Sequence, residues 1–149
     1  MSQGGWIAPI VASKTQDLVF VVNISAATVS TDEQLLFEEY NNIAPYTYSF
    51  LAKIISPITA NNLKNKEYIA ALMGFDPVPY WKKVHTPVFM AYGENDTNCP
   101  VEQSLNRLDE HKLNHFKTKI YPNGGHGILD TGSPVIHPNS PGYNKQYQR

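Results

Sequence analysis

The chain has 149 residues, a formal net charge of −1 and one cysteine. This length suits one domain, and no basic stripe points to nucleic acid or an anionic membrane surface. No stretch approaches ~18 consecutive apolar residues, so no membrane span is predicted. The lone Cys99 excludes an intrachain disulfide and fits a reducing compartment such as the cytoplasm, without fixing the location.

The first part of the chain predicts a helix, then a strand, then a second helix. Residues 3–13 place apolar side chains at helical spacing. Residues 18–24 form a nearly continuous apolar, β-branched run, which is typical of a strand buried on both faces of a parallel sheet. Ser30 or Thr31 is expected to cap the next helix, and Glu33 would complete a capping box if Ser30 is the cap.

The segment 30–75 is predicted to be a helical insertion between strands. Within it, residues 61–66 indicate a polar loop or a helix start, and residues 68–73 are helical again, with Gly74 suited to the C-terminal cap. The segment is rich in large side chains: Tyr40, Tyr46, Tyr48, Phe50 and Leu51. They either line a substrate pocket beneath a cap or pack the helices together. We favour the cap, because long insertions between strands often carry binding function.

The second half continues the alternation of strands and helices. Residues 87–92 and 116–121 predict strands, and residues 101–111 predict a helix between them with Leu105 and Leu108 facing inward. The sequence therefore predicts an α/β fold with about three parallel strands, flanking helices and right-handed crossovers.

Three side chains stand where an active site would form. Ser2 precedes the first helix, Asp96 follows the second predicted strand, and His126 follows the third. Taken singly, each is more often a terminal, turn or loop residue than a catalytic one. Together their positions are consistent with one active site, because sites in open α/β sheets form at the carboxyl ends of the strands.

The motifs around these residues resemble those of the α/β-hydrolases. Residues 2–9 (SQGGWIAP) are similar to the nucleophile elbow of esterases and of prolyl-oligopeptidase-like serine hydrolases. Residues 88–100 (VFMAYGENDTNCP) resemble the acid-bearing strand and loop, and residues 121–126 (YPNGGH) resemble the histidine loop. The order Ser, Asp, His also matches this family, and the resemblance runs from residue 2 to about residue 130.

The resemblance implies a role for each matched residue. Ser2 would be the nucleophile, His126 the general base and then acid, and Asp96 the carboxylate that orients the imidazole. The backbone N–H of Gln3 would be one oxyanion-hole donor. The implied substrate is a small-molecule ester or a related acyl compound, cleaved through an acyl-serine. Peptidases and acyltransferases share this scaffold, so they remain alternatives.

No cofactor or metal is expected. Four further histidines, His85, His111, His115 and His137, show no ligand spacing with Cys99 or with carboxylates. No glycine-rich phosphate loop is present either, because the glycines around His126 open no helix.

The motif also departs from the family pattern. The first glycine of the elbow, the strand that should carry it and the loop of the second oxyanion donor are absent from the sequence. The resemblance therefore implies that residues 1–149 are the C-terminal portion of a hydrolase domain, truncated at both ends, with residues 30–75 as its cap.

Three other interpretations stay open at this point. The chain could be an inactive remnant or an interaction module, and it could self-associate through an exposed edge of the strand at residues 18–24. Alternatively, removal of Met1 would make Ser2 an N-terminal nucleophile whose amine acts as the base. The last interpretation leaves Asp96 and His126 unexplained.

Overall fold

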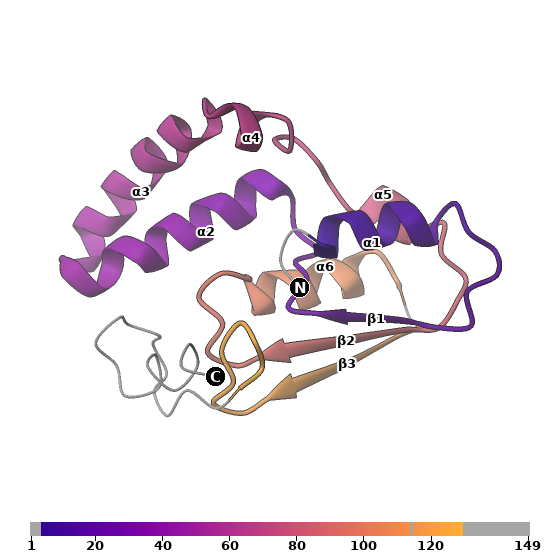
Figure 1. The fold of residues 1–149 in the computed structure, drawn as a ribbon. Helices are drawn as coiled ribbons and strands as arrows, with labels where there is room; N and C mark the ends of the chain where they lie inside the picture. Colours follow the sequence, from indigo (N-terminus) through magenta and orange to yellow (C-terminus); the bar gives the residue numbers. More distant parts are fainter. Residues whose placement is uncertain (1–3, 114, 130–149) are drawn as a thin grey trace.

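The computed structural model describes residues 4–113 and 115–129 and contains one parallel sheet (Figure 1). Its strands are β1 (Val21–Ile24), β2 (Val88–Gly93) and β3 (Phe116–Tyr121), in the order β1-β2-β3. Val88 at the start of β2 pairs with Val21 on one side and with Phe116 on the other. The prediction of an α/β fold with three parallel strands is confirmed.

Six α-helices and one short 3-10 helix accompany the sheet in the described residues. They are α1 (Gly4–Ala12), α2 (Thr31–Ile43), the 3-10 helix η1 (Ala44–Tyr46), α3 (Ser49–Lys64), α4 (Glu67–Ala70), α5 (Val78–Trp81) and α6 (Val101–Glu110). The expected loop or helix start at residues 61–66 is instead largely the end of α3. Its polar residues Asn61 and Asn62 lie on the exposed face of that helix, which explains the misleading composition.

Local capping fixes where α2 begins. Ser30 is the N-cap, since its Oγ accepts a hydrogen bond from the Glu33 N–H at 3.3 Å and Glu33 Oε2 accepts from the Ser30 N–H at 2.8 Å. Thr31 has another role, donating its hydroxyl to the carbonyl of Leu72 at 2.8 Å. Gly74 has a φ of +74°, the left-handed conformation that glycine favours at the end of a helical region.

The core lies on one face of the sheet. Helices α1, α5 and α6 all cover this face, as Figure 1 shows. Val88, Met90 and Tyr92 alternate along β2 and point into it, where they meet Trp81. Cys99 is also fully buried, and burial raises the pKa of its thiol well above the usual range. Cys99 therefore packs as a small apolar residue, and its thiol is not poised to react.

The expectation that the first strand is buried on both faces is wrong. β1 begins only at Val21, and the side chains of Val19, Phe20 and Val22 are 82%, 65% and 51% exposed. The physical reason is that, in the described part of the chain, helices pack on a single face of the sheet. An apolar run of this kind marks a strand but does not say how many layers cover it.

Candidate active site

Asp96 lies in the tight turn after β2. Its backbone N–H donates to the carbonyl of Gly93 at 3.2 Å, which closes the turn. Its carboxylate is fully buried, and Oδ1 accepts hydrogen bonds from the backbone N–H groups of Asn98 (2.8 Å) and Cys99 (2.9 Å). Backbone donors that point at one oxygen fix the orientation of the carboxylate without neutralising its charge.

His126 lies in the loop after β3, and this loop is bound to the turn that carries Asp96. The Asn95 N–H donates to the carbonyl of Gly124 at 2.8 Å, and the Asn123 N–H donates to Glu94 Oε2 at 3.0 Å. Neighbouring parallel strands end at one edge of the sheet, so their following loops meet there. The two loops therefore form one hydrogen-bonded unit.

Gly93 makes this close approach possible. A Cβ atom at position 93 would overlap the carbonyl oxygens of Gly124 and Gly125, which are backbone atoms of the His126 loop. Only glycine leaves the loops in contact here.

The side chains of Asp96 and His126 form a pair. Nδ1 of His126 lies 3.0 Å from both carboxylate oxygens of Asp96. Nε2 of His126 is buried and has no hydrogen-bond partner among the described residues. In the neutral imidazole tautomer that donates Nδ1–H to the Asp96 carboxylate, Nε2 carries the lone pair. An imidazole held this way can accept a proton from a hydroxyl group placed next to Nε2.

The other two predicted site residues, Ser2 and Gln3, lie outside the described residues. The nearest observation concerns α1, which begins two residues after Ser2. A Cβ atom on Gly5 would lie 2.5 Å from Cβ of Ala26, so the start of α1 packs directly against the backbone beyond the carboxyl end of β1. Figure 1 shows this start at the same end of the sheet as the loops of Asp96 and His126.

Residues of α2 that the sequence did not single out also reach the site. Asn98 Nδ2 donates to Glu38 Oε1 at 3.0 Å, and Asn41 Nδ2 donates to the carbonyl of Thr97 at 3.2 Å. These contacts fasten α2 to the loop of Asp96. The place of Asn98 in this loop could have been found, because an Asp side chain often accepts from the backbone N–H two residues on, in an Asx turn. Glu38 is 60 residues away along the chain and carries no such signal.

Glu38 has a perturbed acidity. Burial raises the pKa of its carboxyl group above 4.5, the hydrogen bond from Asn98 opposes this rise, and the charges of His126 and Asp96 act in opposite directions. Glu38 is therefore close enough to sense both members of the pair. In the folded protein it holds its proton to higher pH than in the unfolded chain.

The Glu38→Gln variant should be more stable than the parent at pH 7. Since the folded-state pKa is raised, the stability linked to Glu38 is full below its unfolded pKa and is lost as the pH rises through the folded value. Glutamine can still accept the hydrogen bond from Asn98, and because it does not ionise, the loss of stability above the folded pKa is removed. Each kcal/mol gained in the free energy of unfolding should raise Tm by about 2–4 °C. Thermal unfolding at pH 4 and pH 7 checks this, with exposed Glu110→Gln on α6 as the control. An equal gain at both pH values would contradict the assignment.

No helix of the described residues is long and apolar enough to cross a membrane. Within the same residues, no group of three or more His, Cys, Asp or Glu side chains could hold a metal ion.

Comparison with known proteins decides the family. Residues 1–137 match the model of the prolyl oligopeptidase family. The chain belongs to this family of serine hydrolases. Over 60 residues, 39% of its length, it is 35% identical to a protein of Bacillus subtilis named "Uncharacterized peptidase YuxL", of which it covers 9%.

Comparison with solved structures identifies the fold. An esterase of Pyrococcus furiosus superposes with a TM-score of 0.54 at 14% identity, over 85% of this chain and 44% of the esterase. An acylaminoacyl peptidase of Pyrococcus horikoshii matches with a TM-score of 0.49 at 18% identity, over 91% of this chain and 20% of the peptidase. The likeness to the esterase shows that the family member has a partial α/β-hydrolase fold. The chain spans less than half the length of each of these proteins.

Proposed function

We propose that this prolyl oligopeptidase family member cleaves a carboxylic ester or a related acyl bond through an acyl-serine intermediate. The observation that carries the proposal is the state of His126. Its Nδ1 is held by Asp96, while its Nε2 is buried and has no hydrogen-bond partner in the described part of the chain. A serine hydroxyl is a weak nucleophile at neutral pH and needs such a base. Ser2, which precedes α1, is the residue assigned to that place.

The reaction proceeds in two steps. Ser2 Oγ attacks the acyl carbon as its proton passes to His126 Nε2, and the bond to the leaving group breaks when His126 returns that proton to it. Water then attacks the acyl-serine, gives a proton to His126, and releases the acid and the free Ser2 hydroxyl. Asp96 keeps the imidazole oriented and stabilises its charged form. The backbone N–H of Gln3, aided by the start of α1, donates to the oxyanion.

We assign residues 30–75 to a cap over this site. Helices α2, α3 and α4 fill the segment, and two hydrogen bonds attach it to the loop of Asp96: Glu38 accepts one from Asn98, and Asn41 donates one to Thr97. A cap fixed to the catalytic loop can restrict which substrates reach the reacting pair.

Hydrolysis of p-nitrophenyl butyrate tests the proposal. The folded chain should release p-nitrophenol, and Ser2→Ala should reduce that rate to background. If the folded chain releases p-nitrophenol no faster than Ser2→Ala does, the chain is an inactive remnant. Alanyl-p-nitroanilide tests the second candidate, a peptidase, which the match to the peptidase of Bacillus subtilis favours. Faster cleavage of the anilide than of the ester would identify the chain as a peptidase.

We also propose that the chain associates with a second copy of itself through β1. The outer edge of β1 is unpaired within the described residues, and Phe20 beside it is largely exposed. Such edges pair with another strand unless something covers them. Light scattering should give a mass above 16.7 kDa that falls toward the monomer in Phe20→Lys. A stable monomer of the unaltered chain would contradict this.

A further inference from the structure

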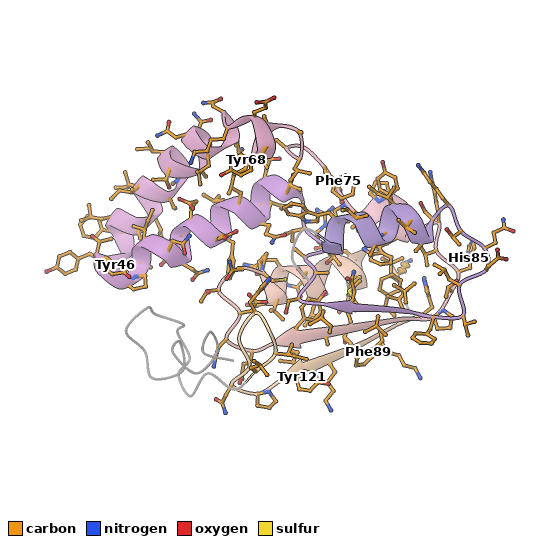
Figure 2. The ribbon with its side chains drawn as sticks, in the orientation of Figure 1. Tyr46, Tyr68, Phe75, His85, Phe89 and Tyr121 are labelled. Carbon is orange, nitrogen blue, oxygen red and sulfur yellow. The ribbon has the colours of Figure 1, made fainter. Side chains whose placement is uncertain are left out.

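A pocket of about 300 Å³ lies between α2 and α4. Its lining includes Trp6 of α1, Gln34 and Glu38 of α2, and Tyr68 of α4. Figure 2 labels Tyr68. Glu38 links this pocket to the loop of Asp96, because its Oε1 accepts a hydrogen bond from Asn98 Nδ2.

Two polar atoms in the lining lack hydrogen-bond partners among the residues that the structure describes. Gln34 is only 4% exposed, yet its Oε1 has no hydrogen bond among the described residues. Trp6 Nε1 is likewise buried and unpaired. Folded proteins rarely leave buried donors or acceptors unsatisfied, and such groups at a site call for an explanation. Here one atom is an acceptor and the other a donor.

We propose that this pocket binds a neutral carboxamide group of the substrate. Its carbonyl accepts from Trp6 Nε1, and its N–H donates to Gln34 Oε1. The carbon chain next to the carboxamide packs on Leu35, Leu63 and Leu72, which also line the pocket. The inference rests on the proposed function, since it takes the bound group to be part of a molecule cleaved at His126.

A carboxamide satisfies the two unpaired atoms better than an ammonium or an alkyl group does, although the carboxylates of Glu38 and Glu39, also in the lining, would attract an ammonium. An ammonium group has donors only, so it would leave the indole N–H of Trp6 unpaired. An alkyl group would leave both Trp6 and Gln34 unpaired and would gain nothing from their positions. A group that both donates and accepts satisfies the two atoms at once.

The indole N–H resonances of the ¹⁵N-labelled full chain test this directly. The protein has two tryptophans, and Trp81 is fully buried in the core, so Trp6 alone should respond. Isovaleramide should shift the Trp6 signal saturably. Its isosteres should bind about threefold more weakly or worse: 4-methyl-2-pentanone, which only accepts, and isoamylamine, which only donates. Trp6→Phe assigns the signal.

The Gln34→Leu variant gives the second test. It should weaken isovaleramide binding about 3- to 10-fold, leave ketone binding unchanged, and keep or raise Tm, because it removes an unpaired buried carbonyl. Exposed Gln103→Leu on α6 should change none of these quantities. Tighter binding of the amine, no saturable shift with any probe, or equal weakening of all probes in Gln34→Leu would overturn the proposal. Because no acylation is measured, failure here is separate from failure of Ser2 as the nucleophile.

Discussion

Replacing His126 by glutamine is expected to lower ester turnover by about 10⁴-fold or more. Glutamine fills similar space and can still donate to Asp96, but it has no lone pair of suitable basicity where Nε2 stood. Without a base, the Ser2 hydroxyl stays protonated and attacks slowly. Asp96→Asn should cause a loss of similar size, since the imidazole is no longer held with its proton on Nδ1. Initial rates with p-nitrophenyl butyrate measure both variants.

The matched control is His85→Gln. His85 is exposed and lies just before β2, at the end of the sheet opposite to the site. Its replacement should leave the rate within about twofold, because a surface change far from the site has little effect on stability or structure. If His85→Gln and His126→Gln reduced the rate equally, His126 would have no special role.

Replacing Gly93 by alanine is expected to disrupt the contact between the loop of Asp96 and the loop of His126. The added methyl group would meet the carbonyl oxygens of Gly124 and Gly125, and backbone atoms cannot move aside as a flexible side chain can. Overpacking of this kind destabilises a fold by about 1–3 kcal/mol. The loop of His126 must also shift away from Asp96, so turnover should fall by at least about 100-fold, as for a displaced catalytic group.

Gly4→Ala is the control for stability, because a Cβ atom there has no neighbour within 4 Å among the described residues. Thermal unfolding and turnover should be measured on both glycine variants. A Gly93→Ala protein with unchanged Tm and unchanged turnover would show that contact between the two loops is not required.

The pairing of Asp96 with His126 could be predicted from the sequence because its signals are local. Asp96 and His126 each follow a strand with a clear apolar pattern, and parallel strands bring their carboxyl ends to one edge. The capping box at Ser30 can be predicted for the same reason, because it depends on two residues three positions apart.

Other features depend on which surfaces meet, and the sequence does not show this. The exposed side of β1 reflects how many layers of helices cover the sheet, which no property of Val19 or Phe20 reveals. The bond between Glu38 and Asn98 needs α2 to fold back over the acid loop. Within the described residues, the side-chain carbonyl of Gln34 is left unpaired in a pocket that α2, α4 and Trp6 form together.

The most direct test of the central claim is covalent labelling of the folded chain with a fluorophosphonate, followed by mass spectrometry of its peptides. We expect a single adduct on Ser2 that disappears in Ser2→Ala and forms at least about 10³-fold more slowly in His126→Gln. An adduct on a different residue, or no adduct on protein shown to be folded, would contradict the convergence of Ser2, His126 and Asp96 in one site.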